Sequence, residues 1–257
     1  MTYLVICTVA LLASALTFFS GFGLGTLLLP AFVLFFPIEQ AVALTAVVHF
    51  LNGLFKLALV GRHADRKVVL RFGLPAIVAS FLGAVVLVWL AGVAPLFSYS
   101  AFGQLLSITL VNLVIGLLLL FFASLEFLPR FRTLSFGAQF MPLGGVLSGF
   151  FGGLSGMQGA LRSAFLSRAG LTKEAFIGTG VLVACLIDFT RLGIYFSSLA
   201  KEGASLDYSL LAAAVLSAFI GTMLGNKYLK KSTMLGIQRM VAVMLFMVAL
   251  GLITGVL

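Results

Sequence analysis

The stretch GFFGGLSGMQG, residues 149–159, interrupts an apolar run that covers residues 141–168. A second glycine-rich stretch, SGFGLGTLLLP at residues 20–30, interrupts the uncharged run 3–36. Glycine weakens helices and permits backbone angles that other residues avoid. Inside lipid, the backbone groups freed by such a break need partners, so a break persists where it packs inside protein or lines a wet cavity. Close packing of whole helices at small residues is the alternative explanation for each stretch taken alone.

The composition places both stretches in a membrane. Of the 257 residues, 62% are hydrophobic and 9% are charged, whereas soluble domains have ~45–50% and roughly 25%. The mean hydropathy is +1.23. These values exclude a soluble enzyme, a disordered chain and a secreted disulfide scaffold, and they predict an all-α polytopic membrane protein. Cys7 and Cys185 lie in apolar runs, so we expect buried thiols rather than a disulfide.

Six further stretches have the ~20 mainly apolar residues that a membrane-crossing helix needs. They are about 41–60, 68–91, 103–123, 175–196, 208–225 and 235–256. An offset of 134 positions aligns Gly25 with Gly159, so the two glycine breaks occupy corresponding places in two halves of the chain. We therefore predict a first repeat over 1–123, a linker over 124–140 and a second repeat over 141–257. Paired glycine-broken segments of this kind point to the binding site of a transporter.

The distribution of basic residues distinguishes two topologies. If each glycine-broken stretch crosses the membrane once, the linkers on one side hold seven basic residues and those on the other side hold six. If each is a re-entrant hairpin, twelve of these residues fall on one side and only Lys201 falls on the other. Because Lys and Arg collect in cytoplasmic loops, we predict two inverted repeats, each a hairpin plus three spans, in the cytoplasmic (inner) membrane. The same rule explains the net charge of +9 without a nucleic-acid partner.

Ionisable side chains inside a bilayer are costly and often functional. In the 41–60 span, Thr45, His49, Asn52 and Lys56 recur every three or four residues and so share one helix face. Two interpretations remain for this face. It is a packing stripe in which Lys56 reaches toward the interface and His49 bonds a neighbouring helix, or it lines a substrate site where His49 relays a proton.

Two arginines are candidates for holding an anion. Arg191 lies one turn after Asp188, with Tyr195 on the same face, and this pair is either an internal salt bridge or a coupling acid beside an anion-binding arginine. Arg162 follows the second glycine stretch and offers a planar fork to an oxyanion, unless it pairs with Asp188 or reaches the cytoplasmic interface. The helix starts after each break add free N–H groups and a positive dipole end. Neutral donors near the breaks are Thr26, Ser155 and Gln158.

Three motifs carry a resemblance to a known family. They are SGFGLGTLLLP at 20–30, GGLSGMQGALRS at 152–163 and KEAFIGTG at 173–180, the last followed by Asp188 and Arg191. On these motifs nearly the whole chain resembles the sulfite exporter TauE/SafE family of membrane proteins. The resemblance implies export of small sulfur-containing anions: sulfite, sulfonates such as sulfoacetate, or thiosulfate. The family is commonly described with seven or eight spans, which differs from six spans plus two hairpins.

We therefore expect a secondary transporter that holds its anion between the glycine breaks, with Asp188 as the coupling residue. The candidate substrate-binding residues are Gly23, Gly25, Thr26, His49, Asn52, Ser155, Gln158, Gly159, Arg162 and Arg191. We expect no catalytic residue, metal or cofactor; the partners are the anion and the lipid bilayer, with a homo-oligomer left open. The chain carries no G-x-x-x-x-G-K-[ST] sequence, so it does not hydrolyse ATP itself.

Two alternative functions remain. A passive anion channel would use the same site without coupling. An intramembrane serine protease is the other, because Gly153-Leu154-Ser155-Gly156 matches the G-x-S-G pattern of the rhomboid proteases. A nucleophilic serine needs a base within hydrogen-bond reach. His49 precedes the serine instead of following it, and the sole tryptophan, Trp89, lacks the arginine neighbour of the rhomboid loop.

Overall fold

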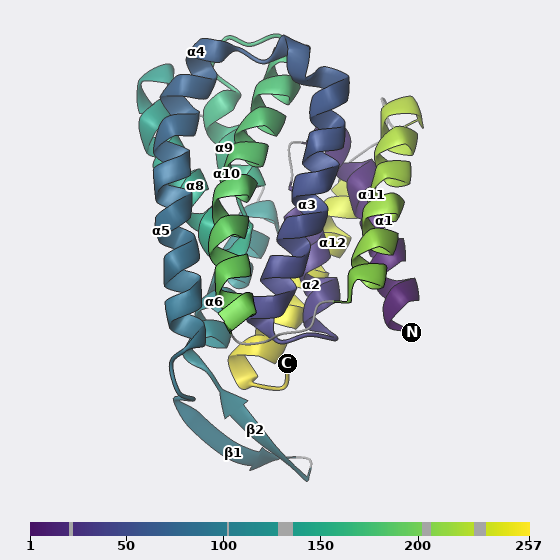
Figure 1. Ribbon diagram of the computed structural model, residues 1–257, viewed down its shortest axis with the longest axis vertical. Coiled ribbons are helices and arrows are strands. Elements are labelled where there is room, and N and C mark those ends of the chain that lie inside the picture. Colours follow the sequence, from purple (N-terminus) through teal and green to yellow (C-terminus); the bar gives the residue numbers. More distant parts are fainter. Residues whose placement is uncertain (21–22, 102, 128–135, 202–206, 229–234) are drawn as a thin grey trace.

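The chain forms a bundle of helices from which one β-hairpin extends (Figure 1). A computed structural model describes residues 1–20, 23–101, 103–127, 136–201, 207–228 and 235–257. The bundle has two ends, which we call the α4 end and the β end after the elements that lie there (Figure 1). Both chain termini lie toward the β end (Figure 1).

The elements follow the predicted order of two broken stretches and six further helices of 18 residues or more. Those of the first half are α1 (Thr2–Ser20), α2 (Leu24–Val33), α3 (Ile38–Val60), η1 (Gly61–His63), α4 (Arg66–Val68), η2 (Val69–Gly73), α5 (Leu74–Ala91), β1 (Phe97–Ala101), β2 (Gln104–Ile108) and α6 (Leu110–Phe127). Those of the second half are η3 (Ala138–Phe140), α8 (Met141–Ser155), α9 (Gly159–Leu166), α10 (Lys173–Lys201), α11 (Tyr208–Tyr228) and α12 (Leu235–Thr254).

The distribution of side chains is that of a membrane protein. The outer face of α5 exposes large apolar groups, among them Val78 and Trp89, while Asp188 and Arg191 are completely buried. Apolar groups face outward because lipid, unlike water, does not disfavour them. Within the described residues, four helical segments are long and apolar enough to cross a membrane: Ile38–His63, Arg66–Ala91, Lys173–Ser198 and Tyr208–Lys227. The predicted all-α polytopic membrane fold is confirmed.

The first glycine-broken stretch returns to the end at which it begins. The Tyr3 hydroxyl donates to Asp207 just before α11, and Ala15 packs against Gly225 near the end of α11, so α1 runs parallel to α11. After the break, α2 descends along α3 with Gly25 close to Thr45. Because α1 and α3 both begin toward the β end (Figure 1), this stretch has the path of a hairpin.

Asp207 fixes the start of α11 and, through Tyr3, the position of α1. Its Oδ1 accepts hydrogen bonds from the Ser209 hydroxyl at 2.5 Å and from the backbone N–H of Leu210 at 2.9 Å, which is the geometry of a helix N-cap. These bonds, the Ser209 hydroxyl first, hold the pKa of Asp207 below its ordinary value. The cap is therefore complete above the unfolded-state pKa and is lost as the pH falls through the lowered one.

The second glycine-broken stretch starts from the opposite end. Three glycines, spaced by four residues along α8, pack on the backbone of η2 and α5: Gly145 on Phe72, Gly149 on Ala76 and Gly153 on Ser80. The residue numbers of these contacts increase together along the two helices, so α8 runs parallel to α5. Both helices run away from the α4 end. Then α9 returns, with Phe165 against Gly144. A side chain at Gly153 would collide with the Ser80 carbonyl, so the glycine allows the two backbones to touch.

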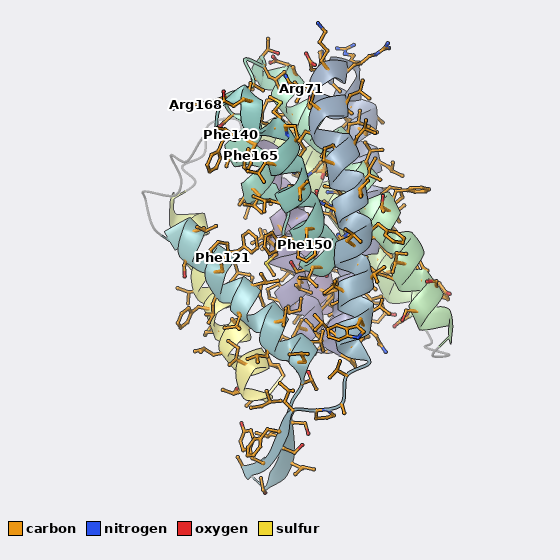
Figure 2. All side chains as sticks on the ribbon, turned by 90° about the vertical axis from the view of Figure 1, so that its left-hand side faces the viewer. Arg71, Phe121, Phe140, Phe150, Phe165 and Arg168 are labelled. Atoms are coloured by element: carbon orange, nitrogen blue, oxygen red, sulfur yellow. The ribbon has the colours of Figure 1, made fainter. Side chains whose placement is uncertain are left out.

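The two broken stretches thus enter from opposite ends, as the predicted re-entrant hairpins require. Of the predicted cytoplasmic residues, Arg71 and Arg168 lie toward the α4 end (Figure 2), whereas Lys201 ends α10, which finishes toward the β end (Figure 1). Four other predicted cytoplasmic residues, Arg130, Arg132, Lys230 and Lys231, lie outside the described residues. The inverted-repeat relation and the repeat boundaries stay predictions.

The predicted span at 103–123 is wrong at its start. Residues 104–108 form strand β2, and the helix α6 begins only at Leu110 and continues to Phe127. Gly103 has φ +75° and turns the chain, so that Tyr99 pairs with Leu106 in an antiparallel ladder. The Tyr99 hydroxyl donates to the carbonyl of Thr254 at 2.6 Å and so holds the hairpin against the end of α12. Apolar content alone did not distinguish this short strand from the helix that follows it.

Candidate functional site

The two glycine breaks meet in the middle of the bundle. A methyl group placed on Gly23 would lie 3.8 Å from the backbone nitrogen of Gly159. One placed on Gly25 would lie 3.2 Å from the carbonyl oxygen of Gly156. The starts of α2 and α9 therefore face each other, and both present the positive end of a helix dipole.

Gly156 ends α8 in a conformation that favours glycine. Its φ is +81°, and its N–H bonds the carbonyl of Gly152 at 2.9 Å, as in a helix C-cap. A Cβ at this position would lie 2.9 Å from Nη1 of Arg191. The glycine therefore both turns the chain and leaves space for a guanidinium group.

A completely buried carboxylate, Asp188, lies beside this turn and has three polar partners. Its Oδ2 lies 2.5 Å from Nδ1 of His49, and its Oδ1 accepts from Nε of Arg191 at 2.9 Å and from Nε2 of Gln158 at 3.2 Å. The partners come from α3, from α10 itself and from the second glycine break. A buried charge needs such compensation, so Asp188 fixes the relative positions of all three segments.

Arg191 is only partly satisfied by this carboxylate. Its Nη2 lies 2.9 Å from Oδ1 of Asp188, but neither terminal nitrogen has a well-aligned hydrogen-bond acceptor among the described residues. The Tyr195 ring centroid lies 5.9 Å from Cζ of Arg191, and the Tyr195 hydroxyl donates to the carbonyl of Gly153. The predicted Asp188–Arg191 salt bridge is present, and it retains unused donors on the side of the glycine turn.

Arg162 connects to the same network through an amide. Its Nη1 donates to Oε1 of Gln158 at 2.9 Å, and the amide nitrogen of Gln158 donates to Asp188. Among the described residues, no carboxylate lies within ion-pair distance of Arg162. The direct pairing with Asp188 that the sequence allowed does not occur, so Arg162 lies next to a cavity without an ion-pair partner among the described residues.

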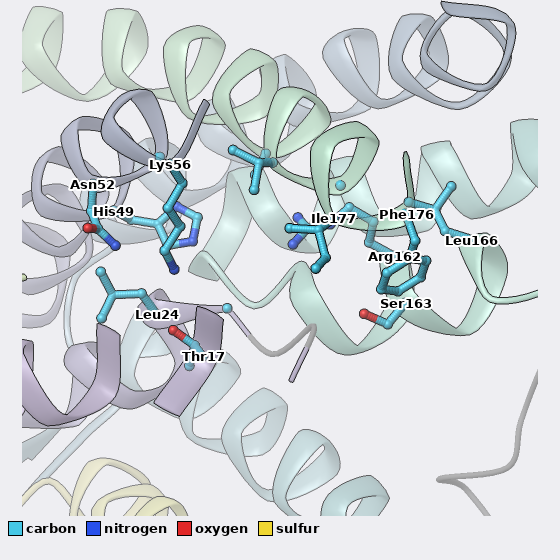
Figure 3. Close-up of a pocket in the computed structure, with 15 residues that line it drawn as sticks. Thr17, Leu24, His49, Asn52, Lys56, Arg162, Ser163, Leu166, Phe176 and Ile177 are labelled. Carbon is cyan, nitrogen blue, oxygen red and sulfur yellow. The ribbon is translucent and has the colours of Figure 1, made fainter. Parts of the chain in front are cut away.

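This cavity lies between α2, α3, α9 and α10 and contains about 600 Å³ of empty space, including its open mouth (Figure 3). It is lined by Thr17, Gly23, Leu24, His49, Asn52, Gly53, Lys56, Arg162, Ser163, Leu166, Phe176, Ile177, Gly180, Val181 and Ala184. The lining reaches from the glycine break at Gly23 to Leu166 at the end of α9, so it extends toward the α4 end. No acidic residue is among these lining side chains, and two of them are cations, Lys56 and Arg162.

The candidate residues divide into those that line the cavity and those that lie behind its wall. Lining it are Gly23, His49, Asn52 and Arg162. Not lining it are Gly25, Thr26, Ser155, Gln158, Gly159, Asp188 and Arg191. Two candidate residues already have partners: the Asn52 amide oxygen accepts from the Thr222 hydroxyl at 2.8 Å, and the Ser155 hydroxyl donates to the carbonyl of Phe151 at 2.9 Å.

Lys56 and Ser163 also line the cavity but were not among the candidates. The sequence placed Lys56 on the polar face of an apolar span. A side chain that extends toward the membrane interface explained this position equally well. The structure shows it 9% exposed and turned into the cavity with His49 and Asn52 (Figure 3). Nothing in the sequence singled out Ser163, because its position in the cavity lining depends on how α9 packs against α10.

The geometry removes the basis of the protease alternative. The described hydrogen bonds of Ser155 go to the backbone of Phe151 and Met157, and those of His49 go to Asp188. No hydrogen bond joins Ser155 to His49 in the described structure, so His49 is not positioned to activate this serine. Within the same part of the chain, no group of three or more His, Cys, Asp or Glu side chains is arranged to hold a metal ion.

A comparison with protein-family models matches residues 6–252 to the sulfite exporter TauE/SafE family. The chain belongs to this family. The match includes both glycine breaks and every residue that lines the cavity, and it confirms the resemblance drawn from the three motifs. No curated protein matches the chain. TauE/SafE is a family of membrane transporters named for sulfite export, and the four membrane-length helices agree with a multi-pass member of it.

Proposed function

We propose that the protein is a secondary transporter that exports small sulfur-containing anions across the cytoplasmic membrane. The observation that carries this proposal is the cavity with two buried cations, Lys56 and Arg162, and no acidic lining residue. Buried cations in a membrane interior are costly, and a bound anion in the cavity offsets their positive charge. Sulfite, sulfonates such as sulfoacetate, and thiosulfate are the substrates that family membership favours.

The cavity offers three kinds of group to such an anion. Arg162 supplies the planar fork that matches two oxygens of one oxyanion. The start of α2, at Gly23 and Leu24, supplies backbone N–H groups and the positive end of its dipole. Lys56 supplies a second charge. With the membrane potential negative inside, an anion released from this site is driven outward.

We propose Asp188 as the coupling residue, with His49 as its connection to the cavity. His49 lines the cavity, while its Nδ1 lies 2.5 Å from Asp188, which has no contact with solvent. A proton that enters from the cavity therefore reaches Asp188 through the imidazole ring. Histidine suits this relay because its two ring nitrogens exchange donor and acceptor roles near neutral pH.

Reconstitution tests this function directly. Purified protein in liposomes should transport sulfite, sulfoacetate or thiosulfate with saturable kinetics, and the rate should change when a pH gradient is imposed. A channel would instead give flux proportional to the gradient, without saturation at low millimolar anion and without dependence on the pH gradient. If the protein moves none of these three anions, although circular dichroism shows it folded, the proposed function is wrong.

The orientation of the cavity is open to a separate test. The cavity extends toward the α4 end, which we propose faces the cytoplasm because basic residues gather there. Single cysteines introduced next to Arg66 and Lys173 should react only with a membrane-impermeant reagent applied from the cytoplasm, in a background without Cys7 and Cys185. A cysteine next to Glu39 should react from outside. Labelling of the Arg66 and Lys173 sites from opposite sides would contradict the hairpin topology.

A further inference from the structure

We propose that the space over the α-carbon of Gly23 is a binding position for one oxygen of the transported anion. Three polar atoms face this position: the backbone nitrogen of Gly159, Nε2 of His49 and the hydroxyl oxygen of Thr26. The position rests on the proposed function, because Gly23 and His49 line the cavity described above. It adds a ligand from each glycine break and a physical reason for the missing side chain at residue 23.

The position is defined by three equal distances. A Cβ placed on Gly23 would lie 3.8 Å from the nitrogen of Gly159, from Nε2 of His49 and from Oγ1 of Thr26. Among the described residues these are its nearest heavy atoms, apart from those of the chain neighbours of Gly23. Hydrogen bonds join heavy atoms about 2.7–3.2 Å apart, so an oxygen needs to move only about 1 Å from this point to bond any one of the three. Gly159 and Thr26 do not line the cavity, but these two atoms face the space over a residue that does.

Neither the backbone nor the packing requires a glycine at residue 23. Gly23 has φ −76° and ψ 134°, a conformation open to every L-residue. A Cβ at 3.8 Å from its neighbours would make only ordinary van der Waals contacts. In contrast, Gly156 needs its φ of +81°, and a side chain at Gly153 would collide with the Ser80 carbonyl. The missing side chain of Gly23 therefore leaves space for a ligand and not for a turn or a neighbouring helix.

Each of the three atoms suits an oxyanion. Gly159 is the first residue of α9, so its N–H has no partner within its own helix and lies at the positive end of the dipole. The hydroxyl of Thr26 can donate to the anion, and this side chain is 6% exposed. Nδ1 of His49 faces Asp188, so Nε2 is the ring nitrogen that faces Gly23. The hydrogen between Nε2 and the ligand comes either from a doubly protonated ring or from a hydrogensulfite ion.

A buried hydroxyl of the same cavity indicates a polar occupant independently. Oγ1 of Thr17 has no hydrogen-bond partner among the described residues, although the side chain is only 5% exposed. Thr17 lines the cavity together with Gly23 and Leu24 (Figure 3). Leaving a buried hydroxyl unsatisfied is costly, so the cavity favours an occupant that accepts hydrogen bonds over an apolar one.

The variant Gly23→Ala fills the proposed position with a methyl group. The fold should persist, because the backbone conformation and the contacts both accept alanine. Sulfite binding to the purified protein, measured by calorimetry, should weaken at least about 10-fold, since hydrogen bonds to a charged ligand are lost. The matched control is Gly73→Ala, which adds the same methyl group at ordinary contact distance from Leu186, Val69 and Val183 and away from the cavity lining. This control should bind sulfite with wild-type affinity.

The variant Thr26→Val tests the same position without filling it. Valine keeps the branched shape of the side chain but removes the hydroxyl, so sulfite affinity should fall about 10-fold. Its control is Thr190→Val, because the Thr190 hydroxyl donates to the carbonyl of Leu186 within its own helix. Thermal unfolding of all four variants would show that each is folded.

Wild-type sulfite affinity in folded Gly23→Ala protein would overturn the proposal, because it would mean that only water occupies the position. Wild-type affinity in folded Thr26→Val protein would overturn it as well, so the test does not depend on one variant. If the wild-type protein itself binds no sulfite, sulfoacetate or thiosulfate, the proposed function is wrong and not only this position.

Discussion

Replacing Arg162 with glutamine should abolish sulfite transport while leaving insertion and folding intact. The side chain lines the cavity, and no carboxylate of the described residues lies within ion-pair distance of it. Glutamine removes both the charge and the fork, so an anion in the cavity would lose its principal partner. The protein itself should tolerate the change, because it removes a buried charge that has no ion-pair partner among the described residues, together with one hydrogen bond to Gln158.

Arg162→Lys should have an intermediate effect. Lysine keeps the charge but loses one of the two parallel hydrogen bonds of the fork, and a hydrogen bond to a charged group contributes about 1.5–3 kcal/mol. Apparent affinity for sulfite should therefore fall roughly 10-fold to 100-fold, with transport retained at high concentration. Initial rates in liposomes across a range of sulfite concentrations would separate the two variants.

The matched control is Arg168→Gln, since Arg168 follows the same hairpin but is exposed near the α4 end (Figure 2). This change removes the same charge from a position outside the cavity, so transport should stay close to the wild-type level. If Arg162→Gln protein transports sulfite with wild-type affinity and rate, Arg162 does not hold the anion.

Much of the architecture was predictable because it depends on local composition. Apolar runs of about 20 residues identify spans, and glycines such as Gly156 and Gly23 mark where helices must break. The hairpin at 97–108 was missed for a physical reason: its pairing of Tyr99 with Leu106 and its anchor on Thr254 are contacts between segments. An apolar strand next to an apolar helix has no local signal that separates the two.

The site was predictable only in part, since residues far apart in the sequence make it. The Asp188–Arg191 pair is one helical turn apart and could be proposed from spacing. The bond between His49 and Asp188 joins α3 to α10 across 139 positions, and periodicity carries no information about such a contact. For the same reason it could not be known that Lys56 and Arg162 line the same cavity, although each was recognisable as a rare cation in an apolar segment.

The second large effect should follow from Asp188→Asn. The change leaves Arg191 completely buried without a counter-charge, and breaking a buried ion pair in this way costs about 3–5 kcal/mol. The asparagine must also face Nδ1 of His49 with either an amide oxygen or an amide nitrogen, so part of the present network is lost in both orientations. Unfolding in detergent should therefore occur at a distinctly lower temperature. Glu174→Gln, at the exposed start of the same helix, should leave stability unchanged and serves as the control.

Loss of stability alone does not distinguish a structural salt bridge from a coupling acid, and a double variant makes the distinction. Asp188→Asn combined with Arg191→Gln removes both charges, so it should recover part of the lost stability, as expected for residues that interact directly. If Asp188 carries the coupled proton, the folded Asp188→Asn and double variants should both transport without responding to a pH gradient, or not transport at all. Wild-type dependence on the pH gradient in either folded variant would remove Asp188 from the mechanism and leave it as the residue that holds His49, Gln158 and Arg191 together around the glycine turn.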